Sequence, residues 1–122
     1  MISVGSRLYI SDNSGAVTAT CIKVPGNSTR MKGKPGNVII VTLNKVKSNK
    51  KITPHQIKKA LLVGTVYPFR KANGVSIRFS KNSAILLDDR GAPLSNRVKQ
   101  HVLSDLRAKH YMKIISISFG IL

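Results

Sequence analysis

One stretch indicates the fold, running from Ala60-Leu61-Leu62-Val63 through Asn73-Gly74 to Ile85-Leu86-Leu87. Asn-Gly is the strongest short signal for a β-hairpin, because both residues tolerate a positive φ. The apolar runs on either side are short enough for buried strands. Cations stand between and beside these elements, at Arg70, Lys71, Arg78 and Lys81. The stretch therefore predicts a small apolar β-core that holds a cationic rim in place.

The composition limits the class of protein. A chain of 122 residues with 42% hydrophobic residues has the size of one domain with a single core, over residues 1–122. It carries 21 Lys and Arg against 4 acidic residues, for a net charge of +17. Such a surface repels itself unless a polyanion neutralises it. The cations are spread along the chain and not gathered on one amphipathic helix, so a nucleic acid is favoured over a membrane.

The residue types needed for catalysis are sparse. Cys21 is the single cysteine, so no disulfide can form within the chain, and a buried core position is expected. The three histidines lack the spacing of metal ligands. Asp88-Asp89 leads into Gly91 and indicates a turn, not a catalytic pair. We therefore expect no enzyme activity, no metal site and no cofactor.

The first half of the chain reads as strands joined by turns. Residues 7–11 and 16–24 alternate apolar and polar residues, with a turn at Asp12-Asn13-Ser14-Gly15 between them. The run Val38-Ile39-Ile40-Val41 opens the clearest strand, at residues 37–46. Because this run is continuously apolar, it predicts a strand buried on both faces, as in a closed barrel.

Two basic segments are candidates for phosphate contact. The predicted loop at residues 27–36 carries Arg30, Lys32 and Lys34 without an acid, and phosphate binding and plain solvation fit it equally well. The second segment favours phosphate contact, because it has six cations and no acid. These cations are Lys45, Lys47, Lys50, Lys51, Lys58 and Lys59. Within it, Thr53-Pro54-His55-Gln56 predicts a helix of about one turn.

The character of the chain changes after residue 90. Residues 92–100 predict a loop, and Ser104 can cap a short helix that reaches Lys109. Residues 112–119 are apolar, but their pattern fits a strand and a short helix equally. On the residues alone we predict a mainly β protein, with a barrel over residues 1–90 and a loop with a short helical appendage over residues 91–122.

The aromatic content is low, at 5%. Tyr67 and Phe79 lie in strand-like patterns and are expected in the core. Proteins that bind single strands by stacking need exposed aromatic residues. The sequence therefore favours recognition of folded RNA by its shape and backbone.

Three separated blocks resemble the fourteenth universal family of large-subunit ribosomal proteins, of the bacterial or organellar type. The spacing within Ala60–Leu87 resembles its signature, Asp12–Ala16 with Cys21–Val24 its first block, and Leu106-Arg107 with Met112–Ser116 its last. The blocks are in register nearly from end to end. The resemblance implies a five-stranded β-barrel with a projecting β-ribbon and short C-terminal helices.

The resemblance also implies a role and partners. The family is a structural constituent of the large subunit, on large-subunit rRNA near the subunit interface, beside a neighbouring ribosomal protein, with a bridge to small-subunit rRNA. By resemblance, Lys45–Lys59 and Arg30–Lys34 face large-subunit RNA. The side near the subunit interface, or a protein contact, would hold Arg97, Lys99, Arg107 and Lys113.

One loop departs from the family pattern. Members usually carry Gly-Thr-Arg-Ile or -Val, then Phe-Gly-Pro-Val, where this chain has Ser95-Asn96-Arg97-Val98-Lys99-Gln100-His101-Val102. In the family this surface receives a ribosome-silencing factor, which we carry as a further expected partner. The change adds Lys99, which favours RNA contact.

The source and the competing functions can be stated as expectations. Enrichment in Ile, Lys and Asn is typical of an AT-rich genome, such as an organelle's, and no targeting peptide is visible. We therefore expect an organelle-encoded protein of a mitochondrial ribosome, with a bacterial cytoplasm or a plastid as alternatives. The alternative function is a free-standing basic barrel, such as an RNA chaperone or nucleoid protein. A nuclease would need clustered acids and is disfavoured.

Overall fold

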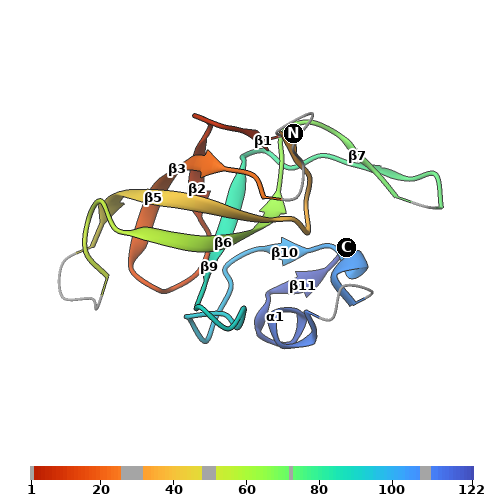
Figure 1. The fold of residues 1–122 in the computed structure, drawn as a ribbon. Coiled ribbons are helices and arrows are strands. Elements are labelled where there is room, and N and C mark those ends of the chain that lie inside the picture. Colours follow the sequence, from red (N-terminus) through yellow and green to blue (C-terminus); the bar gives the residue numbers. More distant parts are fainter. Residues whose placement is uncertain (1, 26–31, 48–51, 72, 108–110) are drawn as a thin grey trace.

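A closed barrel of five strands forms the centre of the molecule in a computed structural model, which describes residues 2–25, 32–47, 52–71, 73–107 and 111–122. The order around the barrel is β2-β3-β5-β6-β9 (Figure 1). The strands are β2 Arg7–Ile10, β3 Ala16–Lys23, β5 Val38–Val46, β6 Ile57–Gly64 and β9 Ser83–Leu87. The predicted mainly β fold with a five-stranded barrel is therefore confirmed.

Four antiparallel pairings and one parallel pairing close this barrel. The antiparallel register places Leu8 opposite Ala19, Cys21 opposite Val41, and Ala60 opposite Leu86. The parallel pairing joins β2 to β9, with Ile10 beside Ala84. Because every barrel strand has a neighbour on both sides, the barrel has no open edge.

The interior of the barrel is filled by one side of each strand. In β5, Ile39, Val41 and Leu43 are buried, whereas Val38 and Ile40 between them are only half-buried. The prediction that this strand is buried on both faces is wrong. The apolar run faces the interior with alternate residues, and nothing in the described chain covers Ile40 enough to bury it.

The strands buried on both faces are β6 and β9. Ala60, Leu62, Ala84 and Leu86 belong to the barrel interior. A second core forms from the residues between them, which are Leu61, Val63, Ile85 and Leu87, together with Val98, Val102, Leu106, Ile114 and Ile115. The C-terminal residues thus cover the outer face of β6 and β9, on one side of the barrel (Figure 1).

The covering segment contains short elements. The 3₁₀ helix η1 spans Ser104–Arg107, the helix α1 spans Met112–Ile117, and the strands β10 (His101–Val102) and β11 (Gly120–Ile121) pair in parallel. The open choice for residues 112–119 is therefore resolved as a helix up to Ile117. Lys109 lies outside the described residues, and the predicted short C-terminal helices are confirmed. No helix in the described ranges has the length and apolar character needed to cross a membrane.

Two small ribbons extend the barrel. β7 (Phe69–Arg70) pairs with β8 (Ser76–Ile77), and their hairpin projects away from the barrel (Figure 1). Gly74 has φ of 88° in its turn, as the Asn73-Gly74 signal predicts. β1 (Ile2–Ser3) pairs with β4 (Lys32–Gly33). Lys32 therefore lies in a strand, although the sequence predicted a loop there.

The predicted helix at Thr53-Pro54-His55-Gln56 is wrong. His55 has φ of 63°, and its N–H donates to the Leu43 carbonyl at 2.7 Å, while the Leu43 N–H donates to the Gln56 carbonyl at 3.0 Å. These bonds end the ladder between β5 and β6. The hairpin therefore uses the backbone groups that a helix would have needed.

Both predicted aspartate turns are confirmed. Asp12 Oδ1 accepts a hydrogen bond from the Ser14 N–H at 3.1 Å. Asp88 Oδ1 accepts hydrogen bonds from the N–H groups of Arg90 and Ala92, both at 2.9 Å. In each turn, the carboxylate satisfies backbone donors that follow it in sequence.

Candidate nucleic-acid interface

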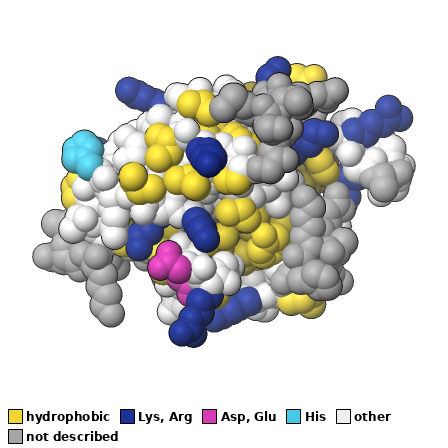
Figure 2. Space-filling view, in the orientation of Figure 1, with side chains coloured by type: hydrophobic (Ala, Val, Ile, Leu, Met, Phe, Trp, Pro, Cys, Tyr) yellow, Lys and Arg dark blue, Asp and Glu magenta, His cyan; other side chains and the backbone are white. Residues whose placement is uncertain are grey.

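Cations are distributed over the surface with few acids among them. Figure 2 shows dark-blue Lys and Arg side chains dispersed over the face that it draws, with acidic side chains confined to a small area. Where the structure describes their side chains, and apart from Lys32, the lysines and arginines form no ion pair with an aspartate; the side chains of Asp105 and Arg107 are outside this description. The positive charge of the described surface is therefore largely uncompensated within the chain.

The hairpin of β5 and β6 carries part of the predicted RNA-binding set. Lys45 is exposed and lies opposite Thr18, and Lys47 is exposed just after β5. Lys59 is exposed in β6, whereas Lys58 is half-buried opposite Val41. Lys50, Lys51 and Arg30 lie outside the described residues, so the described part of the cluster is at the two strand ends.

The second part of the predicted set lies near the β7–β8 ribbon. Lys34, Arg70 and Arg78 are exposed. Lys71 is half-buried and donates to Ser104 Oγ at 3.2 Å and to the main-chain oxygen of Leu122 at 3.0 Å. Lys71 thus joins the base of the ribbon to the C-terminal segment, a role that its place in a basic loop did not indicate.

The predicted interface residues lie on the C-terminal segment. Arg97, Lys99 and Lys113 are exposed, and Arg107 is the last residue of η1. Lys113 and Lys58 line one groove of about 640 Å³, together with Leu94 and Ile117. The fold therefore brings together one residue predicted for large-subunit RNA and one predicted for the subunit interface.

The described residues contain no cluster of three or more His, Cys, Asp or Glu that could hold a metal ion. Asp12, which is 4% exposed, uses its carboxylate for structure: Oδ2 accepts from the buried Leu86 N–H at 3.0 Å. The geometry thus provides a cationic surface on a rigid barrel. Electrostatic contact with a polyanion is the chemistry that such a surface supports.

Comparison with known protein families matches residues 1–122 to ribosomal protein L14p/L23e. The chain belongs to this family. It is a structural constituent of the large ribosomal subunit, and its place is the ribosome. The family assignment and the barrel agree with the resemblance on which the expected role was based.

The aromatic residues of this L14p/L23e family member are placed differently from the prediction. Tyr67 is 59% exposed, so its assignment to the core is wrong, and Phe79 is only half-buried. Tyr9 and Phe119 are also exposed, at 49% and 74%. Tyr9 could have been found from the alternation Leu8-Tyr9-Ile10, which places it on the face opposite to two core residues. For Phe119 the sequence carries no comparable signal.

Proposed function

We propose that this protein binds large-subunit rRNA through its basic strands and loops and takes part in a bridge to small-subunit rRNA. The observation that carries the proposal is the uncompensated charge. The chain has a net charge of +17, and among the side chains that the structure describes no Lys or Arg other than Lys32 forms an ion pair with an aspartate. In a ribosome, the polyanion that surrounds such a protein is rRNA. Its phosphates would neutralise the repulsion among these cations.

The rRNA-facing set extends from the β5–β6 hairpin to the β7–β8 ribbon. Its members are Arg30, Lys32, Lys34, Lys45, Lys47, Lys50, Lys51, Lys58, Lys59, Arg70, Lys71, Arg78 and Lys81. Most of the described members are exposed at the ends of barrel strands or on the projecting ribbon. Rigid strands hold the cations at fixed separations, which suits a folded RNA of fixed shape.

The bridge set lies on the C-terminal segment, at Arg97, Lys99, Arg107 and Lys113. Lys58 of the rRNA-facing set and Lys113 of the bridge set line the same groove. This supports contact of the two sets with RNA at adjoining parts of the surface. A neighbouring large-subunit protein and a ribosome-silencing factor are the proposed protein partners of this region. Lys99 adds a cation to the loop on which the factor would bind.

We assign the particle to a mitochondrial ribosome. The support is the composition, rich in Ile, Lys and Asn, and the altered loop from Ser95 to Val102. Mass spectrometry of mitochondria isolated from the source organism should find the protein with the other large-subunit proteins. Its presence only in the cytoplasm or in plastids would contradict this assignment.

The experiment compares two sets of charge-neutralising substitutions in the full chain. The first variant replaces Lys45, Lys47, Lys50 and Lys51 by Gln. It should keep its circular-dichroism spectrum and bind large-subunit rRNA more weakly, with a log–log salt slope smaller by about three if all four cations contact phosphates. The measurement is binding to large-subunit rRNA at several salt concentrations.

The second variant replaces three cations of the bridge set, Arg97, Lys99 and Lys113, by Gln. We expect this variant to enter large subunits and to reduce the joining of the two subunits, measured by sedimentation. Unchanged rRNA binding by the first variant would show that its lysines are merely solvated. Release of the wild-type protein from large subunits at moderate salt would support the free-standing chaperone instead.

A further inference from the structure

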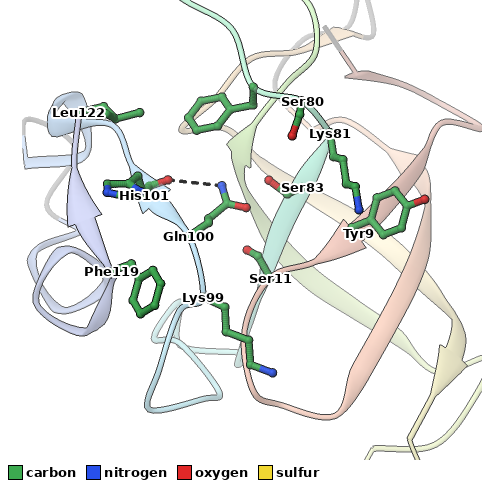
Figure 3. A pocket seen from close by; sticks show the side chains of 11 residues that line it. Tyr9, Ser11, Ser80, Lys81, Ser83, Lys99, Gln100, His101, Phe119 and Leu122 are labelled. Carbon is green, nitrogen blue, oxygen red and sulfur yellow. Dashed lines mark hydrogen bonds between the residues drawn. The ribbon is translucent and has the colours of Figure 1, made fainter.

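A cleft of about 510 Å³ lies between the barrel and the C-terminal strands. Ser83 and Tyr9 belong to its barrel side, and His101 and Phe119 to its C-terminal side (Figure 3). Its size is that of a small-molecule or nucleotide site. We call it the Ser83 cleft, after the residue at its floor.

The Ser83 hydroxyl is unusual among the buried polar groups. Ser83 is 4% exposed, and within the described part of the chain its Oγ is the only buried side-chain oxygen or nitrogen without a hydrogen-bond partner. Buried hydroxyl groups normally have a partner, because leaving one unpaired is unfavourable. The Ser83 side chain extends from β9 and points toward the Gln100 side (Figure 3). A ligand in the cleft would supply the missing partner.

The floor of the cleft depends on a glycine. Gly64 lies opposite Ser83 in the barrel register. A Cβ atom at Gly64 would stand 2.7 Å from Ser83 Oγ and 3.0 Å from Phe79 Cγ, both too close for unchanged packing. The missing side chain therefore leaves the space beside Gly64 that the Ser83 hydroxyl, the Phe79 ring and the Gln100 amide approach. A hydrogen-bonding group beside an aromatic ring is suited to a flat polar ligand.

The rim adds exposed rings and positive charge. Phe119 is 74% exposed, and its ring packs edge-on to the His101 ring with centroids 6.5 Å apart. Lys81 Nζ lies 4.7 Å from the centre of the Tyr9 ring, and Lys99 is exposed on the other wall. No acidic residue lines the cleft. Flat rings with two cations and no acid match a nucleobase with its phosphates better than a peptide.

We propose that the Ser83 cleft binds one unstacked base of an RNA strand. Ser83 Oγ hydrogen-bonds the edge of the base, Phe119 offers a ring for stacking, and Lys81 and Lys99 contact the flanking phosphates. Sequence-specific and loop-specific contacts with RNA commonly use bases that are splayed out in this way. The inference rests on the proposed rRNA binding and adds a base-dependent contact to a surface otherwise argued from charge alone.

The test uses the full-length protein and two short RNA-like oligomers of equal length. One is an abasic ribose-phosphate chain, and the other carries a single central base, with each of the four bases tried in turn. Fluorescence anisotropy measures both affinities. We expect at least one base to raise affinity by about fivefold or more, because stacking on an aromatic side chain contributes on that scale.

The variants separate the base from the phosphates. Phe119→Ala and Ser83→Ala should each lower the gain from the base, whereas Lys99→Gln should weaken both oligomers alike. Ser83→Ala should not lower the melting temperature, because the hydroxyl has no partner to lose in the free protein. Met112→Ala is the matched control: Met112 is 56% exposed on α1, does not line the cleft, and should change neither affinity.

Three results would overturn the inference. Equal affinity of the wild type for all oligomers, with normal binding of large-subunit rRNA, would refute base binding in the cleft and leave the proposed function intact. Failure of the wild type to bind either the oligomers or large-subunit rRNA would refute the proposed function as well. The third result combines two observations: the base still raises the affinity of Phe119→Ala, and ribosomal particles assembled with this variant lack a neighbouring ribosomal protein. It would identify the cleft as a protein contact.

Discussion

Two outer faces of the same barrel differ in what lies on them. The covered face, on β6 and β9, presents Leu61, Val63, Ile85 and Leu87, and the C-terminal segment packs over all four. The open face, on β3 and β5, presents Thr20, Ile22, Ile40, Thr42 and Asn44, each at least partly exposed. The barrel interior is apolar on both sides. The type of residue at the outward positions therefore decides where the C-terminal segment docks.

The open face is exposed to solvent and carries polar residues at several of its outward positions. Thr20 lies opposite Thr42, and Asn44 Nδ2 donates to Thr20 Oγ1 at 2.6 Å. Such cross-strand pairs are compatible with solvent and still favour the strand conformation. Beyond Asn44 the strand continues through Lys45 into the basic segment. The difference teaches that apolar outward residues support packing on one face, whereas polar outward residues leave the other face exposed to solvent.

The largest expected effect tests the covered face directly. Ile85→Ala should lower the free energy of unfolding by about 2–5 kcal/mol, because Ile85 is 0% exposed between the barrel and the C-terminal segment. Its matched control on the open face, Ile40→Ala, should cost clearly less, since Ile40 is only half-buried. Urea denaturation of both variants gives the comparison. Equal losses would show that the two faces are packed alike.

A smaller effect is expected at the joint between the barrel and the C-terminal segment. Asp12→Ala should lower stability by about 1–3 kcal/mol, because the buried Leu86 N–H loses the Oδ2 acceptor. Asn13 stands next to it and makes an exposed bond across the same joint, from Nδ2 to Asn96 Oδ1 at 2.7 Å. Asn13→Ala should therefore cost less than about 1 kcal/mol. Thermal denaturation measures both losses. A larger loss of stability in Asn13→Ala than in Asp12→Ala would contradict the structural role given to the Asp12 carboxylate.

The smallest effect concerns the interior behind the open face. Burial raises the pKa of the Cys21 thiol. In the unfolded chain the thiol ionises at its ordinary pKa, whereas in the folded barrel it keeps its proton to higher pH. The stability that Cys21 contributes is therefore present below the ordinary thiol pKa and is lost as the pH rises through the folded value.

The measurement for Cys21 is the difference in unfolding free energy between wild type and Cys21→Ala across this alkaline window. The wild type should lose stability relative to the variant, at no more than about 1.4 kcal/mol per pH unit. Lysine titration is common to both chains and cancels in the difference. A difference that does not change with pH would contradict a raised pKa for the buried thiol.

Local signals predicted much of this fold. The alternation Leu8-Tyr9-Ile10, the Asn73-Gly74 turn and the aspartate turns all depend on residues close in sequence, and each is found as expected. Local signals could not predict which apolar strand the C-terminal segment covers. The run at Val38–Val41 and the run at Ala60–Val63 look equally apolar. The second run is covered by a segment that lies about forty residues further along the chain, whereas the first run packs against that core only through the half-buried Val38.

The candidate site was predictable in charge and not in arrangement. The uneven count of Lys and Arg against Asp indicates a polyanion partner without knowledge of the fold. Lys71 could not be recognised as a clamp, because its partners, Ser104 and Leu122, are distant in sequence. Ser83 likewise becomes notable only when the barrel register sets it opposite Gly64. Juxtapositions of this kind arise from topology and leave no local pattern.

The parallel pairing of β2 with β9 has a consequence for the order in which the molecule is made. Ser11 contacts Ala84, 73 positions later, so the edge of β2 that does not pair with β3 stays unpaired until β9 has been synthesised. The hairpin of β5 and β6 joins neighbouring stretches and can form well before that. A nascent chain would thus display cations at Lys45, Lys58 and Lys59 while the sheet still has an unpaired border. Early capture by RNA would then shield that border until β9 emerges.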